Sequence, residues 1–159
     1  MMLIENLAIA TGMVIATVTI HFLGLAVLIA VLRAEFAARW REGSAILRGL
    51  TILLTVFALV FLHGLEIWLY AGLFAGLGLF HDLEPALYFS TTSFTTIGYG
   101  DVVIDHTRRM IAAIEGVNGF LLIGWSTAFL VSVTAKMGLL EARLTQNDGA
   151  SRRDPSNLP

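Results

Sequence analysis

The segment that decides the fold reads EPALYFSTTSFTTIGYGD and runs from Glu84 to Asp101. Its first part, residues 85–95, is mostly apolar and begins with a proline, which suits the first turn of a helix. A helix of this length cannot cross a hydrocarbon core about 30 Å thick, because that takes about 20 helical residues. The segment therefore predicts a short re-entrant helix that enters and leaves the membrane by the same face.

The second part, residues 96–100, reads TIGYG and cannot continue as a regular helix, because two glycines flank one tyrosine. Gly98 and Gly100 can adopt backbone conformations closed to residues with a Cβ, so consecutive carbonyls can point to one side. Ile97 and Tyr99 are then expected to direct their side chains the other way. Non-helical backbone at membrane depth is tolerated only where it is buried in protein or lines a cavity. The segment therefore predicts carbonyl oxygens that face one side and can replace the hydration shell of a cation.

Three longer apolar stretches flank this segment, at about Leu7–Leu32, Leu50–Phe74 and Met110–Val133, and each is long enough to cross a membrane. Hydrophobic residues make up 57% of the 159 and charged residues 14%, whereas soluble domains carry about 25% charged residues. The expected fold is an all-α membrane protein with three transmembrane helices and a re-entrant pore helix. Cysteine is absent, which excludes disulfides and thiolate metal sites.

Basic residues predict how these spans are oriented. They gather in a connector at residues 34–49 and in the region after the last span, and only Arg108 and Arg109 lie well away from those places. The positive-inside rule puts the connector and the tail, residues 138–159, in the cytoplasm, and therefore the N-terminus outside. The connector is expected to hold an interfacial helix with Trp40 and a turn at Gly43 and Ser44. The tail is expected to be disordered from Gln146, and a plasma membrane is the expected location.

Residues Thr95 to Asp101 resemble the signature of the potassium channel pore family. The similarity covers residues 50–137, as an outer helix, a pore helix at 85–95, a filter at 96–100 and an inner helix at 108–137. It implies that K⁺ is bound in the filter by carbonyl oxygens, with a hydroxyl oxygen from Thr96. The residues implied as filter ligands or filter backbone are Thr96, Ile97, Gly98, Tyr99 and Gly100.

The resemblance also implies a function and an assembly. One filter loop supplies a quarter of a ring, so a homotetramer is expected, in which each chain has three further copies, the lipid bilayer and K⁺ as its partners. Conduction would be passive, with no cofactor, no enzyme activity and no nucleic acid. The residues expected to support the filter are Thr95, Asp101, Tyr88, Phe89 and Thr92.

Two features depart from the minimal pattern of that family. Thr92 stands where some relatives place a glutamate behind the filter, so a mechanism that depends on that carboxylate cannot be carried over. The first span, residues 1–33, has no counterpart in a two-span pore. It also lacks the regularly spaced arginines of a voltage sensor.

Several polar and small residues in the last span are candidates for gating. Gly119 or Gly124 could act as a hinge, and the alternative is that small residues only let helices approach closely. Glu115 and Asn118 lie three residues apart and so share a helix face. Asn118 could line the cavity and Glu115 could brace the filter from behind the pore helix, or both could form plain hydrogen bonds between helices.

Histidines in the first two spans suggest further alternatives. His63 and Glu66 form a pair that could sense pH or form an interhelical hydrogen bond, and His21 is expected to be a satisfied polar residue. His21 and His63 could instead ligate haem in a small membrane cytochrome, although that hypothesis leaves Gly98 and Gly100 unexplained. Within the channel class, the alternative is a poorly selective cation channel.

Overall fold

The computed structural model describes residues 2–39 and 45–151, and it describes side chains over residues 2–34 and 46–138. This part of the chain forms four helices, which are α1 (Met2–Arg39), α2 (Ala45–Gly76), α3 (Leu83–Phe94) and α4 (Arg109–Ser151). The helices α1, α2 and α4 contain stretches long and apolar enough to cross a membrane, at Met2–Ala34, Ile46–Gly76 and Arg109–Gly138. The predicted all-α fold with three spans is confirmed.

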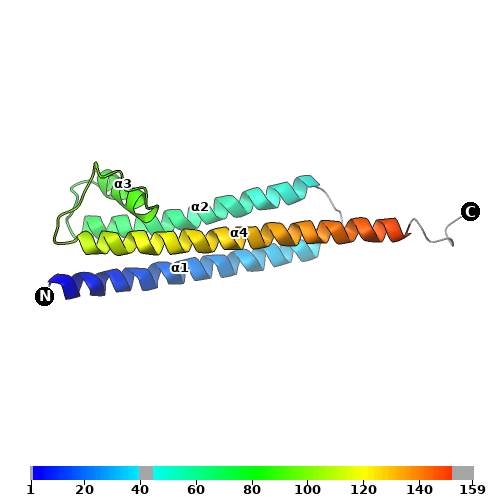
Figure 1. The fold of residues 1–159 in the computed structure, drawn as a ribbon, viewed down its shortest axis with the longest axis horizontal. Coiled ribbons are helices and arrows are strands. Elements are labelled where there is room, and N and C mark those ends of the chain that lie inside the picture. The colour runs from blue at the N-terminus through cyan, green and yellow to red at the C-terminus, as the bar shows by residue number, and fades with distance from the viewer. Residues whose placement is uncertain (1, 40–44, 152–159) are drawn as a thin grey trace, which may run out of the picture.

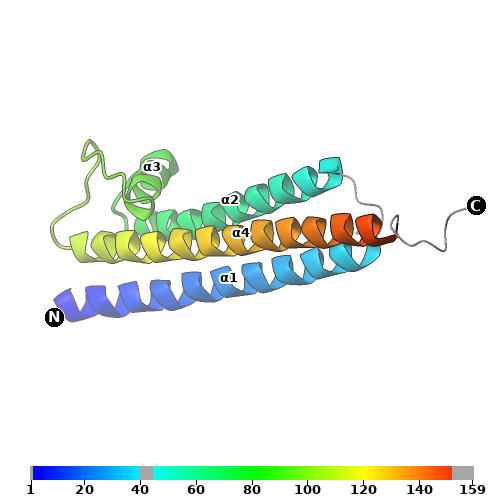
Figure 2. The ribbon, with the colours of Figure 1, turned by 45° about the vertical axis from the view of Figure 1, so that its right-hand side comes forward.

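The three long helices lie side by side along one axis (Figure 1). Helices α1 and α4 run in the same direction and α2 runs in the opposite one, and α1 packs against both of the others. Helix α3 and the loops around it lie at the same end of the bundle as the beginning of α1, which Figure 2 shows from a second angle. The extra span is therefore part of the bundle and not a detached helix.

Two helices extend beyond their apolar stretches. Helix α1 continues to Arg39 and α4 to Ser151, so residues 146–151 are helical although the sequence predicted disorder there. The strong helix formers lie just before this stretch, at residues 139–144 (LLEARL). The helix that they form continues through the polar residues after them. The predicted turn at Gly43 and Ser44, and Trp40 before it, lie outside the described residues.

Helix α3 begins two residues before the proline that was expected to start it. Asp82 is the N-cap residue in an extended conformation (φ −120°, ψ 156°), and Glu84 lies in the first turn. Pro85 is tolerated there because the first N–H groups of a helix have no partner within the helix. The carboxylate of Glu84 also interacts favourably with the positive end of the helix dipole.

Two apolar clusters hold the helices together. The larger one joins α2, α3 and α4 at the end of the bundle that carries α3, and its buried members are Tyr70, Phe74, Phe89, Phe94, Ile111 and Leu122. The smaller one joins α1 to α4 near the opposite end through Leu32, Val133 and Met137. Because α3 is packed through aromatic side chains on α2 and α4, its C-terminal end has a fixed position.

Candidate functional site

The segment after α3 has a backbone in which the sign of φ alternates. Thr96, Gly98 and Gly100 have φ values of +61°, +54° and +77°, and Thr96 is the one non-glycine residue with positive φ in the described part of the chain. A β-branched residue in this region is a true outlier, because its Cβ crowds the backbone. Alternation of this kind turns successive N–H groups to one side. The carbonyl groups between them are then free to face the other way.

Hydrogen bonds fasten the N–H side of this segment to the end of α3. Thr96 N–H donates to the carbonyl of Ser93 at 3.0 Å, and Gly98 N–H donates to the carbonyl of Thr92 at 3.0 Å. The Thr95 hydroxyl donates back to the carbonyl of Thr91 at 2.7 Å. Thr92 therefore supports the segment with its main chain, while its own hydroxyl donates to Phe89 within α3.

The side chains of the segment lie open within a single chain. Ile97 is 53% exposed and Tyr99 is 71% exposed, so neither side chain is wedged against helices of its own chain. The alternate residues of the segment, Thr96, Gly98 and Gly100, line a cavity of about 480 Å³ between α3, the segment and the first half of α4. Its walls include Thr92, Gly98 and Gly116. The segment is thus supported from one side and uncovered on the other.

A phenol and a carboxylate are hydrogen-bonded at the C-terminal end of the segment. Tyr88 in α3 donates its hydroxyl proton to Asp101 Oδ2 at 2.8 Å. This bond lowers the pKa of Asp101 and raises the pKa of Tyr88, because it favours the ionised carboxylate and the protonated phenol. Phe89, in contrast, is buried and packs edge-on against Phe74 with ring centroids 5.4 Å apart.

Glu115 links α4 to the back of α3. Its Oε1 accepts a hydrogen bond from the Ser90 hydroxyl at 2.6 Å, and the same hydroxyl lies 3.0 Å from the carbonyl oxygen of Ile67 in α2. Glu115 Oε2 is buried and has no hydrogen-bond partner among the described residues. The carboxyl group therefore contacts α3 from behind, as one of the two sequence hypotheses for Glu115 required, but no hydrogen bond joins it to residues 96–100.

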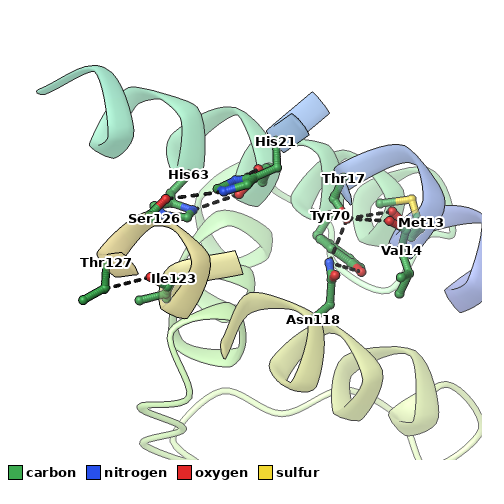
Figure 3. A network of polar contacts seen from close by, with 11 residues as sticks. Met13, Val14, Thr17, His21, His63, Tyr70, Asn118, Ile123, Ser126 and Thr127 are labelled. Carbon is green, nitrogen blue, oxygen red and sulfur yellow. Dashed lines mark hydrogen bonds and ion pairs between the residues drawn. The ribbon is translucent and has the colours of Figure 1, made fainter. Parts of the chain in front are cut away.

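Asn118 does not line the cavity, contrary to one of the sequence hypotheses. Its amide donates to Thr17 Oγ1 at 2.7 Å and lies 3.3 Å from the Tyr70 hydroxyl, and the residue is buried between α4, α1 and α2 (Figure 3). Position 118 lies on the face of α4 that packs on α1. This placement could not be foreseen without knowing where α1 docks.

The two hinge candidates occupy different surroundings. A Cβ added to Gly119 would lie 2.0 Å from the carbonyl oxygen of Phe94, the last residue of α3. At Gly124 an added Cβ would meet nothing within 4 Å in this chain. Gly119 is therefore required for the close approach of α3 to α4. Helix α4 passes through both positions without a break.

The histidines do not fit haem ligation. His21 and His63 lie with ring centroids 5.4 Å apart and ring planes at 27°, so the rings are stacked face to face. Both Nδ1 atoms lie 2.9 Å from an oxygen of Glu66. Two imidazoles that hold a haem iron must instead meet it edge-on from opposite faces of the macrocycle. His21 is a satisfied polar residue, as predicted, because its Nε2 also lies 3.4 Å from the Ser126 hydroxyl.

Polar contacts along α1 form a set that the sequence analysis missed. At the end near α3, Arg108 contacts Glu5 Oε1 at 2.8 Å and Asn6 Oδ1 at 2.9 Å. Thr17 and His21 follow at deeper levels. These contacts are called the α1 seam below. Thr17 and His21 lie four residues apart on one helix face, and that polar face in an otherwise apolar span was the signal that could have revealed the seam.

Three helices long and apolar enough to cross a membrane define the class of this molecule as an all-helical membrane protein. A family model described as an ion channel matches residues 49–136, which is more than half of the chain. The chain belongs to this ion-channel family. No curated protein and no solved structure matches the chain. The match begins after α1, so the family accounts for α2, α3 and α4.

Proposed function

We propose that this ion-channel protein conducts K⁺ selectively and that residues 96–100 form its selectivity filter. The observation that carries the proposal is the alternation of φ at Thr96, Gly98 and Gly100, together with the N–H groups bonded to α3. Donors engaged on one side leave carbonyl oxygens to coordinate a dehydrated cation on the other. Backbone strain costs about 1–3 kcal/mol per residue, and it persists mainly at functional sites.

The ligands would be the carbonyl oxygens of Thr96, Ile97, Gly98 and Tyr99, with the hydroxyl oxygen of Thr96. The C-terminal end of α3 supports this assignment, because a helix carries partial negative charge at that end and therefore favours a nearby cation. Asp101 would contribute an ionised carboxylate at the mouth. K⁺ is the transported ion and no cofactor is required.

Four copies of the chain would surround the filter. One chain offers only one set of carbonyls, and unsatisfied backbone groups cannot face lipid. The exposed side chains of Ile97 and Tyr99 fit this assembly, since a neighbouring copy can cover them and lipid cannot cover the polar backbone beside them. Helix α3 would be re-entrant, and the chain would lie in a plasma membrane with its N-terminus outside and its C-terminus in the cytoplasm.

The proposal is tested by reconstituting the purified protein in liposomes with opposed K⁺ and Na⁺ gradients. A reversal potential close to that of K⁺ is expected, and native mass measurement should give four chains. A reversal potential midway between the two ions would instead support a poorly selective cation channel. An oligomer other than a tetramer would contradict the fourfold filter.

A further inference from the structure

A cluster of two histidines and one glutamate lies between α1 and α2, away from residues 96–100. We propose that His21, His63 and Glu66 form a binding site for a divalent transition-metal ion of the zinc type. His21 and Glu66 are fully buried, and the side chain of His63 keeps 17% of its surface exposed. The cluster is therefore largely enclosed within a single chain.

The distances suit a metal ion. His21 Nδ1 lies 2.9 Å from Glu66 Oε1 and His63 Nδ1 lies 2.9 Å from Glu66 Oε2. The three candidate ligand atoms all lie within 4.8 Å of one another. In a tetrahedral site with Zn–N bonds of about 2.0–2.1 Å, neighbouring ligand atoms are about 3.3 Å apart. An ion can therefore replace the hydrogen bonds with only small shifts of the side chains.

The chemistry of the three groups also suits zinc. Two imidazoles and one carboxylate are a known set of zinc ligands that leaves one coordination position open. His63 and Glu66 lie three residues apart on α2, and His21 comes from α1. Metal sites in helix bundles pair a glutamate and a histidine at this spacing with ligands from facing helices.

The surroundings support the site as well. His21 Nε2 lies 3.4 Å from the Ser126 hydroxyl of α4, visible in Figure 3, and histidines that bind metals usually donate the second ring N–H to such a group. A buried carboxylate requires a positive partner, and the ion pairs of Glu66 in the described part of the chain are with these two histidines alone. A divalent ion held by the two neutral imidazoles would supply that positive charge in place of protonated histidines.

Metal binding at this place would join the extra span to the family pore. His63 also contacts Phe94 at the end of α3, with ring centroids 5.9 Å apart. An ion held by His21 and His63 would therefore fix α1 one side chain away from the helix that carries residues 96–100. Such an ion would be a structural clamp between α1 and the pore.

The test uses Co²⁺ as a spectroscopic probe of the full-length protein in detergent. Because the chain has no cysteine, any visible absorption of tetrahedral Co²⁺ must come from nitrogen and oxygen ligands. The background variant is His81→Gln combined with His106→Gln, which removes the two histidines outside the cluster, both exposed. After metal stripping, this background should bind one Co²⁺ per chain with visible absorption, and Zn²⁺ should displace it.

Variants of the cluster separate a built site from surface binding. His21→Gln and Glu66→Gln should abolish the absorption. Ser126→Ala should weaken Co²⁺ binding by about 10-fold, because the ring of His21 loses the hydroxyl group beside its Nε2. Loss of all binding in the His81/His106 background would show adventitious surface binding and overturn the proposal. Full absorption in the His21→Gln variant would overturn it as well.

Thermal unfolding provides a measurement that does not depend on folding of the variants. Zn²⁺ should raise the unfolding midpoint of the wild-type protein, because a ligand that binds the folded state stabilises it by mass action. No rise at saturating Zn²⁺ and no Co²⁺ absorption would mean that the cluster is held by hydrogen bonds alone, and the metal site would be refuted. Neither readout uses ion conduction, so the outcome is independent of K⁺ selectivity.

Discussion

The α1 seam and residues 96–100 differ in how complete each is within one chain. Along the seam, Thr17, His21 and Asn118 are buried and hydrogen-bonded to partners on other helices. In residues 96–100 the N–H groups of Thr96 and Gly98 are bonded to α3, yet every residue of the segment is exposed. A polar region that is complete within the chain stabilises the subunit, whereas a region that is supported on one side only fits the proposed assembly of several copies.

This difference divides the expected effects of mutations into two kinds. Changes in residues 96–100 should alter conduction and leave the fold of the subunit intact, because few side-chain contacts are made there. Changes in the seam should alter stability and leave ion selectivity intact, because α1, which takes part in every contact of the seam, packs on α2 and α4 and not on α3.

The largest effect is expected for Gly98→Ala. Position 98 has a φ of +54°, where a residue with a Cβ costs about 1–2 kcal/mol, and its N–H is bonded to Thr92. The proposed ring of carbonyl groups should lose its geometry, so the K⁺-selective current expected in liposomes should vanish while the proposed oligomer still assembles. Gly12→Ala is the matched control, because a Cβ at Gly12 meets nothing within 4 Å. Selective current in the Gly98→Ala channel would separate the segment from selectivity.

Gly119→Ala should have the next largest effect, and it should change both the stability of the subunit and its ion conduction. The added Cβ would overlap the carbonyl oxygen of Phe94 at 2.0 Å, and overpacking of this kind costs about 1–3 kcal/mol. The midpoint of thermal unfolding should fall, and current should fall because the end of α3 must move. Calorimetry and liposome flux measure the two effects.

Gly124→Ala is the comparison that isolates a hinge. An added Cβ there meets no atom within 4 Å of its own chain, and alanine favours helix over glycine by about 1 kcal/mol. Under the hinge hypothesis, open probability falls in single-channel recordings while thermal stability holds or rises. Unchanged gating would mean that α4 has no hinge at Gly124.

For Gly119→Ala, a protein as stable as the wild type would contradict the close approach of α3 and α4.

The seam itself is tested by a double-mutant cycle between Thr17→Val and Asn118→Leu. The amide of Asn118 donates to Thr17 Oγ1 at 2.7 Å. Hydrogen bonds between membrane helices contribute about 0.6 kcal/mol on average and up to about 1.7 kcal/mol, so a coupling energy within this range is expected in unfolding experiments. The K⁺/Na⁺ reversal potential should stay at the wild-type value. A shift in that potential would mean that α1 acts on the permeation path.

The sequence predicted the elements of the pore more fully than their contacts. The length of the apolar stretches was sufficient to predict the three spans, because crossing a membrane requires a minimum number of apolar residues. The glycines at positions 98 and 100 were sufficient to anticipate unusual backbone, and positive φ was found at both. Positive φ at Thr96 was not predicted, because a β-branched residue rarely adopts it.

The contacts of α1 could not be predicted, because they depend on how the helices dock. Asn118 was placed in the cavity as one alternative, since nothing in the sequence shows which face of α4 meets α1. Glu66 was paired with His63 from their spacing on one helix, but its bond to His21 joins residues 45 positions apart. Spacing reports neighbours within a helix, and tertiary packing decides the rest.

The smallest effect is expected for Tyr88→Phe at the mouth of the segment. The Tyr88 hydroxyl lowers the pKa of Asp101 below its ordinary value, so this bond stabilises the folded state above the ordinary pKa of about 3.9 and is lost as pH falls through the lowered pKa. Without the hydroxyl, the pKa of Asp101 should rise toward its ordinary value. NMR titration of carboxyl carbons in aspartate-labelled protein measures it.

Asp105 provides an internal control in the same titration. Its pKa is lowered chiefly by the backbone N–H of Thr107, which donates to Asp105 Oδ1 at 2.7 Å, and Tyr88→Phe leaves that donor in place. Asp105 should therefore titrate at the same pH in both proteins while Asp101 titrates higher in the variant. If the pKa of Asp101 is the same in both proteins, the Tyr88 phenol is not hydrogen-bonded to the Asp101 carboxylate in solution. Residues 96–100 would then depend on backbone bonds to α3 alone, and the contrast with the side-chain contacts of the α1 seam would be sharper still.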